Sequence, residues 1–482
     1  MIDLRPIAYL IGRMLIALAI LMLAPAAVDW QAGLENATDF VEAAVITGAF
    51  GVVLSITSHN ALGLSLDTRQ AYLLTAAIWT ILPLFGCLPF MLGAPGLPLA
   101  DAYFEAVSGI TTTGSTVIVG LDNLPPGMNL WRGLLNWIGG LGIAFVAMIF
   151  LPVMRVGGMQ FFRTEGFDTM GKIMPRATDI AGQLVVVYAG LTLACVMTYA
   201  AIGMTALDAV VNAMATIATG GFSPSDISFS KYQGAAEYAG ALFMFLASLP
   251  YIRYAQLMNG APQPILRDMQ VRGYFKVLCC AVFAVTLWRW LTSGQPLEPI
   301  FRQALFNLTS IQSGTGFFSG DFSSWGGFML VVAVLIGIFG PCSGSSGGAL
   351  TMFRVQIAAI ALRQHVRSIT MPDRVDPVRY DGRSVDDDVM NSVIMFITSY
   401  ILIIGLFSVL LTLLGVDMES AFFAVWTSIG NIGYGFGPLL ARTGTFVDFP
   451  DAAKWALSAV MLLGRLSLLA LLVLVLPRFW QR

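Results

Sequence analysis

The chain has 482 residues, of which 57% are hydrophobic and 11% are charged, with a mean hydropathy of +0.78 and a net charge of −2. Soluble proteins carry about 25% charged residues, so this composition excludes a soluble globular protein and indicates a polytopic protein embedded in a lipid bilayer. The five cysteines lack metal-ligand spacing and the two histidines lie at segment ends, which argues against a disulfide framework, a zinc site and a histidine-based active site. We expect no cofactor on this chain and no nucleic acid partner.

Two apolar segments begin the chain, at 7–28 and 38–58. The first has basic residues in front and small residues behind, which also fits a cleaved signal peptide. It is long enough to span a membrane, so we favour a retained helix. The link between the two segments carries acids and no Lys or Arg, which places it outside the cell.

From residue 70 one pattern occurs four times: an apolar span, a short apolar segment, a polar glycine loop and a second span. The spans have about 20 residues, enough to cross the hydrocarbon layer. The short segments have about 10 and cannot cross it, so we predict half-helices that enter the membrane and return. We therefore expect an all-α membrane protein with ten transmembrane helices and four half-helix/filter-loop re-entrant segments in a pseudo-four-fold arrangement. The spans of the four units are 70–92 and 130–153, 181–203 and 236–258, 274–292 and 327–363, and 391–414 and 453–476; the short segments are 101–111, 207–217, 301–312 and 419–429.

This pattern divides the chain into two N-terminal helices and four pore repeats. Asp101, Asp208 and Glu419 stand at the start of three short segments, where we interpret them as ordinary helix caps. The predicted boundaries are 1–69, 70–155, 180–260, 271–365 with an interrupted gate helix, and 390–482.

The four glycine loops are rich in small polar residues and contain no Asp or Glu. A pore selects a cation by replacing its hydration shell with backbone carbonyl oxygens, and the negative C-terminal ends of four half-helices favour a cation. The absence of carboxylates argues against a divalent site. The alternative is four re-entrant turns of a transporter in which glycine serves only the backbone geometry. The loops consist of Thr111, Thr112, Thr113 and Gly114; Ala218, Thr219, Gly220 and Gly221; Ser313, Gly314, Thr315 and Gly316; and Gly430, Asn431, Ile432 and Gly433.

Charge asymmetry sets the predicted orientation. With the N-terminus in the cytoplasm, most of the 26 Lys and Arg residues fall in inner segments. Among these are Arg155, Arg163, Lys172 and Arg176 in one inner loop. This orientation puts both termini in the cytoplasm and all four glycine loops near the outer face.

The stretches SGITTTGST, MATIATGGFS, TGFFSGDF, NIGYGFG and PCSGSSGG resemble the Trk/Ktr/HKT superfamily of K⁺ transporters, most of all its bacterial TrkH/TrkG branch. The resemblance covers nearly the whole chain and implies a K⁺ pore in the bacterial inner membrane, with filter glycines at Gly114, Gly221, Gly316 and Gly433. A serine at the first of these positions accompanies Na⁺ permeation in the family, so four glycines favour K⁺. The resemblance also implies a homodimer and a cytosolic nucleotide-binding regulatory subunit of the TrkA type.

A second feature interrupts the segment 327–363, which is too long for a simple span. Proline and repeated glycine break helices, so we predict either a structural kink or a movable gate here. The resemblance favours the gate, although Ala349 and Thr351 stand where relatives often have glycine and lysine. The gate residues are Gly340, Ser343, Gly344, Ser345, Ser346, Gly347 and Gly348.

Arg465 lies within an otherwise apolar segment. A charge in such a place is costly and faces the protein interior or water. Pairing with a carboxylate is the structural alternative. We favour an arginine that faces the pore and acts as an electrostatic barrier, and the resemblance implies the same role.

These features predict K⁺ uptake through a channel-like pore, and no enzymatic activity. A poorly selective Na⁺/K⁺ pathway is the nearest alternative. A secondary solute transporter with discontinuous helices is the second; it predicts inverted repeats and an embedded acid, whereas the four repeats here run in the same direction. An intramembrane enzyme lacks a recognisable catalytic constellation.

Overall fold

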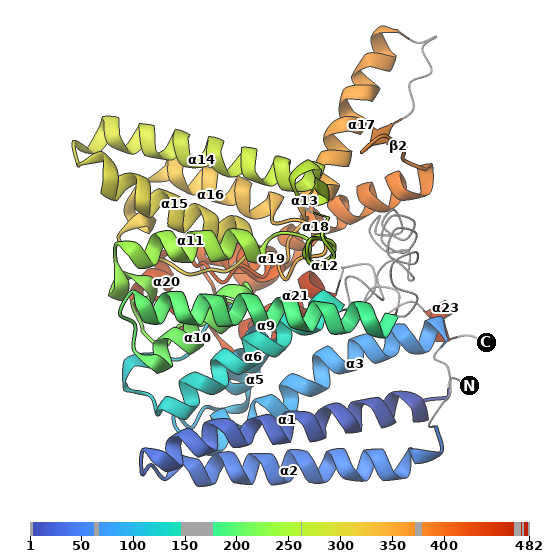
Figure 1. Ribbon diagram of the computed structural model, residues 1–482, viewed down its shortest axis with the longest axis vertical. Coiled ribbons are helices and arrows are strands. Elements are labelled where there is room, and N and C mark those ends of the chain that lie inside the picture. Colours follow the sequence, from blue (N-terminus) through green and yellow to red (C-terminus); the bar gives the residue numbers. More distant parts are fainter. Residues whose placement is uncertain are drawn as a thin grey trace.

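The computed structural model describes residues 3–61, 67–145, 177–261, 263–371, 378–466, 474 and 477–480 (Figure 1). The predicted inner loop with Arg155, Arg163, Lys172 and Arg176 lies outside these residues, as do the ends of the predicted spans 130–153 and 453–476. The described chain is predominantly helical, and its only sheet is a two-stranded antiparallel hairpin of β1 (Arg379–Tyr380) and β2 (Arg383–Ser384).

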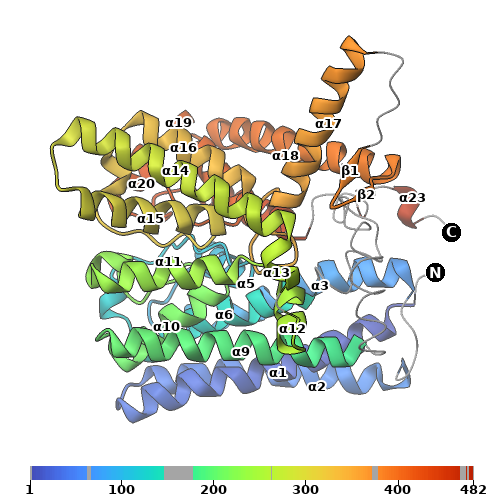
Figure 2. The ribbon, with the colours of Figure 1, turned by 45° about the horizontal axis from the view of Figure 1, so that its top comes forward.

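Helices α1 (Arg5–Gln31) and α2 (Asn36–Thr57) form an antiparallel pair at one edge of the molecule (Figures 1 and 2). Their close approach depends on two glycines: a β-carbon added at Gly12 would lie 2.7 Å from the carbonyl oxygen of Gly51, and one at Gly51 would lie 2.8 Å from that of Gly12. Small residues of this kind let membrane helices pack backbone against backbone.

The rest of the chain follows the four-fold order that the sequence predicts, with a long helix, a short helix, a loop and a further helix in each unit. The units contain α3 (Thr68–Gly86), α4 (Leu88–Leu92), α5 (Leu99–Ile110) and α6 (Pro126–Phe145); α9 (Ala177–Ala201), α10 (Ala206–Ile217), α11 (Ala235–Ala247) and α12 (Tyr251–Met258); α13 (Gln263–Arg267), α14 (Met269–Ser293), α15 (Leu297–Ser313), α16 (Gly327–Phe339) and α17 (Met352–Thr370); and α18 (Asp387–Leu413), α19 (Met418–Gly430), α20 (Pro438–Thr443), α21 (Asp451–Arg465) and α23 (Pro477–Trp480). Long helices such as α9 and α14 run roughly parallel to α11 and α16 (Figures 1 and 2).

Single-turn helices complete the loops. They are η1 (His59–Ala61), η2 (Leu121–Asn123), η4 (Ser228–Tyr232) and η5 (Phe322–Ser324).

Six helical segments of the described chain are long and apolar enough to cross a membrane: α1, α2, α3 together with α4, α9, α14 and α18. They agree with six of the ten predicted spans. The predicted span 236–258 is wrong as a single straight helix, because α11 and α12 are bent by 89°. Pro250 stands at the bend, where it lacks an N–H donor and its ring obstructs helical continuation. The total of ten stays a prediction, since α21 is described only as far as Arg465.

The short helices α5, α10, α15 and α19 have 12, 12, 17 and 13 residues. Helix α15 is therefore longer than predicted. The prediction that Asp101, Asp208 and Glu419 cap three of these helices is wrong, since each lies in the first turn after the cap position. The capping side chains are Thr205, which accepts from the Asp208 N–H at 3.2 Å, and Asp417, which accepts from the Ser420 N–H at 2.9 Å.

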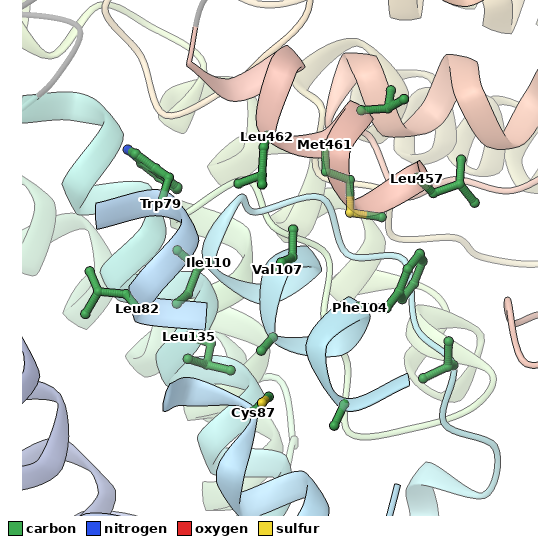
Figure 3. Close-up of a cluster of buried hydrophobic side chains, with 14 of the residues drawn as sticks. Trp79, Leu82, Cys87, Phe104, Val107, Ile110, Leu135, Leu457, Met461 and Leu462 are labelled. Atoms are coloured by element: carbon green, nitrogen blue, oxygen red, sulfur yellow. The ribbon is translucent and has the colours of Figure 1, made fainter. Parts of the chain in front are cut away.

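Helix α5 is buried in the centre of the molecule. Figure 3 shows Phe104, Val107 and Ile110 of α5 among side chains from α3, α6 and α21. Contacts between α5 and α21 join the first unit to the fourth, although the two helices are far apart in the sequence. The four units therefore close on themselves around the short helices.

Candidate functional site

All four short helices end in the same backbone motif. A left-handed residue lies two positions after the last residue of α5 and α10 and one position after that of α15 and α19: Thr112, Thr219, Gly314 and Asn431 have φ of 51°, 52°, 76° and 50°. Its N–H bonds to the carbonyl three residues earlier, at 3.0 to 3.2 Å, and the next N–H bonds to the carbonyl five residues earlier, at 2.8 to 2.9 Å. This is a Schellman ending, which satisfies the last helical carbonyls.

A second left-handed residue follows two positions later in every loop. Gly114, Gly221, Gly316 and Gly433 have φ of 83°, 74°, 85° and 78°. Glycine adopts this conformation without the steric cost that a β-carbon imposes. At the earlier position two of the four residues are threonines, so loops one and two carry β-branched side chains in a conformation they rarely adopt.

These four glycines form a closed ring of contacts. A β-carbon added at Gly114 would clash with the carbonyl oxygen of Gly220, and one at Gly221 with that of Thr315. One at Gly316 would clash with the carbonyl of Ile432, and one at Gly433 with that of Thr113. Each loop thus lies against the next in the order one, two, three, four and back to one. All four glycines line one cavity of about 540 Å³.

Side-chain hydroxyls distinguish opposite pairs of loops. Thr111 and Thr113 share a hydroxyl–hydroxyl hydrogen bond of 2.8 Å, and Ser313 and Thr315 share one of 2.7 Å. Loops two and four have no hydroxyl at these positions. Loop four is tied to loop one instead, because Asn431 Nδ2 donates to Thr113 Oγ1 at 2.9 Å.

An ion pair beside the cavity escaped the sequence reasoning. Arg132 of α6 pairs with Glu105 of α5 at 2.9 Å, with both side chains almost fully buried. Glu105 also accepts from the Val117 N–H at 3.0 Å, and Arg132 Nη1 donates to the Ser223 carbonyl at 2.8 Å. The pair therefore joins loops one and two. Its signal in the sequence is that Glu105 is the only acid at a position where the other units have Asn212, Asn307 and Ala424.

Further ion pairs hold the first turns of two short helices. Lys454 lies 2.5 Å from Asp101, and Lys231 lies 3.2 Å from Asp208. The Asp208 carboxylate also accepts from the Tyr232 hydroxyl. Burial raises the pKa of Tyr232, and the bond to this carboxylate raises it further.

The predicted interruption of 327–363 is present, because α16 ends at Phe339 and α17 begins at Met352. Gly340 and Gly344 are left-handed, with φ of 65° and 82°. Within the interruption, Ser343 Oγ bonds to Thr351 Oγ1 at 2.7 Å and Ser345 Oγ donates to the Cys342 carbonyl at 2.8 Å. These side-chain hydrogen bonds hold the segment in one non-helical conformation.

The interruption lies against the ends of three short helices. Ser346 Oγ donates to the Ile217 carbonyl at 3.0 Å. A β-carbon at Gly347 would lie 2.7 Å from the Ser313 carbonyl oxygen, and one at Gly348 would lie 2.8 Å from that of Gly430. The structure therefore brings the predicted gate residues next to loops two, three and four.

Arg465 reaches the same place. Its Nη2 donates to the Ser346 carbonyl at 2.7 Å, and the residue is 4% exposed. Among the described residues, Arg465 has no carboxylate partner and its Nε and Nη1 have no hydrogen-bond partner. Within that part of the chain no group of three or more His, Cys, Asp or Glu residues is placed to hold a metal ion.

Comparisons with known proteins agree with the resemblance of the loop sequences. The TrkH family model, described as a cation transport protein, matches residues 36–256 and 293–482. The Trk system potassium uptake protein TrkI of Halomonas elongata is 40% identical over 420 residues, which cover 87% of this chain and 85% of that protein. The Trk system potassium uptake protein TrkH of Escherichia coli strain K12 is 32% identical over 486 residues and 99% of both chains.

The fold has a solved counterpart. The crystal structure of the potassium transporter TrkH from Vibrio parahaemolyticus superimposes with a TM-score of 0.92 and 30% identity over 100% of both chains. Together with the six candidate spans, these relationships identify a multi-pass membrane protein. The chain belongs to the TrkH family of cation transport proteins.

Proposed function

We propose that this chain takes up K⁺ across the bacterial plasma membrane through a channel-like pore, with the four glycine loops as its selectivity filter. The closed ring of contacts between the four glycines and the carbonyls of neighbouring loops carries this proposal. Four equivalent loops around one axis offer the arrangement of oxygens that replaces the hydration shell of an ion. The relatives named as potassium uptake proteins support K⁺ as the ion.

The backbone geometry explains how the loops would bind K⁺. Left-handed residues at alternate positions allow carbonyl groups to turn toward a common axis. Four helix C-termini next to the loops add a partly negative field. Carbonyl dipoles hold a monovalent cation without the strong trapping that a carboxylate causes, so the ion can leave again. K⁺ is then the transported ion, held at the filter, rather than a resident cofactor.

The segment 340–348 and Arg465 are proposed as the gate. Their contacts with the helix ends of loops two, three and four support this assignment. A buried guanidinium with no carboxylate partner in the described chain adds a positive barrier to a passing cation.

The proposed topology has ten transmembrane helices, four re-entrant half-helices and cytoplasmic termini. Its two N-terminal helices and four pore repeats have the boundaries predicted from the sequence. Gln70 donates to the Asp3 carbonyl at 2.8 Å, and Arg69 lies 5.9 Å from the centre of the Phe479 ring. Both ends of the described chain therefore lie next to the start of α3, which supports termini on the same side of the membrane. A homodimer and a TrkA-type nucleotide-binding subunit on the inner face are part of the same proposal.

Rubidium uptake into bacteria that lack other K⁺ importers tests the function. Expression of the chain should restore growth at low K⁺ and Rb⁺ uptake, and Gly114→Ser and Gly433→Asp should change uptake and ion preference. Gly405→Ser is the matched control, since a β-carbon at Gly405 meets nothing within 4 Å. Uptake and ion preference that stay the same in both filter variants would contradict the filter assignment. Equal uptake of Rb⁺ and Na⁺ by the unmodified chain would instead favour a poorly selective pathway.

A further inference from the structure

Ser346 and Thr219 connect the proposed gate directly to the proposed filter. Thr219 Oγ1 lies 3.2 Å from Ser346 Oγ and 2.7 Å from the carbonyl oxygen of Ala218. Both side chains are fully buried. The inference rests on the function proposed above and concerns how the gate acts on the filter.

The hydroxyl hydrogens of the pair can be assigned from their acceptors. A hydroxyl carries one hydrogen and two lone pairs. Ser346 Oγ directs its hydrogen to the Ile217 carbonyl at 3.0 Å, with the Ala247 carbonyl farther away at 3.4 Å. Its lone pairs are then open to the Thr219 hydroxyl at 3.2 Å and to the more distant Tyr251 hydroxyl at 3.5 Å. The single hydrogen of Thr219 has two acceptors, Ser346 Oγ and the Ala218 carbonyl oxygen.

This competition is confined to loop two. Thr112 occupies the same place in loop one with nearly the same φ, yet its Oγ1 has no hydrogen-bond partner among the described residues. In loops one and three the hydroxyls of Thr111 and Ser313 bond to carbonyls of the preceding helix turn, at 2.7 and 3.0 Å. Loop four contains no hydroxyl.

The Ala218 carbonyl belongs to the end of the filter that faces the gate. The filter glycines line the cavity, whereas the positions three residues earlier, such as Ser313 and Gly430, lie against Gly347 and Gly348. A carbonyl oxygen that accepts a hydroxyl hydrogen is a weaker ligand for a cation, because the hydrogen and the cation compete for the same electron density.

We propose that Ser346 sets the ion affinity of the gate-facing end of the filter by drawing the Thr219 hydroxyl hydrogen away from the Ala218 carbonyl. With the 340–348 segment in the position described, the Thr219 hydroxyl hydrogen is shared between the Ala218 carbonyl oxygen at 2.7 Å and Ser346 Oγ at 3.2 Å, so Ser346 weakens the hydrogen bond to Ala218 and leaves more of that oxygen to the ion. When that segment moves away, the hydrogen passes to Ala218 and the bound ion is held less tightly. Opening of the gate thereby promotes release of the ion toward the gate side.

The test is a double-mutant cycle on the full chain in proteoliposomes. The readout is the ratio of radiolabelled Rb⁺ to Na⁺ uptake, together with the Rb⁺ concentration that gives half-maximal uptake. A ratio of two fluxes through the same protein cancels changes in the fraction of open pores. Ser346→Ala should lower this ratio roughly three- to ten-fold, the range expected for one buried hydrogen bond, and should raise the half-maximal Rb⁺ concentration.

The second substitution tests whether the effect of Ser346→Ala depends on the Thr219 hydroxyl. In a Thr219→Val background, no hydroxyl hydrogen remains to reach Ala218, so Ser346→Ala should have almost no effect on the ratio. In a Thr112→Val background, Ser346→Ala should keep its full effect. Should Ser346→Ala not be recovered in membranes, Ser346→Cys carries the same test, since a thiol is a weak acceptor of similar size.

Two outcomes would overturn the proposal: Ser346→Ala acting equally in the Thr219→Val background, or losing its effect equally in the Thr112→Val background. Failure of the proposed function has a different signature, namely no Rb⁺ uptake by the unmodified chain. The two failures are therefore distinguishable in the same preparation.

Discussion

The four loops and the four helices that follow them differ sharply in regularity. The loops share one hydrogen-bond pattern, two left-handed positions each and one ring of contacts. The helices after them do not share a form: α6 is continuous over Pro126–Phe145, α11 and α12 are bent by 89°, α16 and α17 are separated by the gate segment, and α21 carries Arg465. The repeated part is the part that would have to present equivalent ligands, and the varied part is the part that would have to move.

This difference sets one irregular element against most of a regular four-fold structure. Among the described residues, the interruption 340–348 belongs to the third unit, and it reaches the ends of short helices in units two, three and four. Arg465 of the fourth unit bonds to the same segment. One irregular segment therefore lies against the ends of three of the four short helices, and one buried charge bonds to that segment.

The largest expected effect tests the equivalence of the loops. Replacing any one of Gly114, Gly221, Gly316 and Gly433 by alanine forces a left-handed β-carbon against a neighbouring carbonyl. Uptake of Rb⁺ should fall roughly 100-fold in all four variants. The control is Gly190→Ala, whose β-carbon would meet nothing within 4 Å. Full activity in one of the four variants would break the comparison, because that loop would then not be equivalent to the rest.

The next effect tests the irregular part. Arg465→Ala removes a buried positive charge and its bond to the Ser346 carbonyl. A lone cation near an ion path costs a passing cation roughly 1–2 kcal/mol at an effective dielectric constant of about 20, so Rb⁺ flux should rise about ten-fold. Arg465→Lys keeps the charge and should stay close to the original flux. An unchanged or lower flux in the alanine variant would count against the barrier role.

A third effect concerns the ion pair that braces loops one and two. Glu105→Gln leaves Arg132 buried without its counter-charge, which typically costs about 3–5 kcal/mol of stability. Thermal unfolding of the purified protein should shift to lower temperature, and Arg132→Gln together with Glu105→Gln should recover part of the loss. A double variant less stable than the single one would mean that the pair contributes more than the cost of an isolated buried charge.

The smallest effect compares two helix caps. Thr205→Ala and Asp417→Ala remove the capping side chains of α10 and α19, each worth about 1 kcal/mol. Both should lower the unfolding temperature slightly without altering the ratio of Rb⁺ to Na⁺ uptake. A change in that ratio with only one of them would show that the N-terminal ends of the short helices are not interchangeable.

The sequence predicted the regular part better than the irregular part, for a physical reason. Loop positions, the break at 340–348 and the first long helix of each unit follow from local patterns of glycine, proline and apolar length. The bend at Pro250 did not, because apolar residues continue on both sides of it and hydropathy alone suggests one span. The sequence does not single out the caps either, because Thr205 and Asp417 lie only a few residues before Asp208 and Glu419, which are equally suited to a helix start.

Long-range pairing lies beyond such patterns. Glu105 and Arg132 are 27 residues apart, and Thr219 and Ser346 are 127 apart. Nothing in the composition of either segment specifies its partner. The order of the ring likewise depends on contacts between units, such as α5 with α21, that only the folded chain provides.

The interlocking of the glycines has a consequence for how the sequence can drift. A side chain gained at one of them would collide with the backbone of another unit, so a change in one repeat is felt by the next. Divergence is therefore channelled to the neighbouring positions, where the chain has Thr, Ala, Ser and Gly in one row and Thr, Gly, Thr and Ile in another. Along the aligned short helices and loops, the four repeats share only two positions: this glycine, which each neighbour holds in place, and a buried alanine twelve residues earlier, at Ala102, Ala209, Ala304 and Ala421.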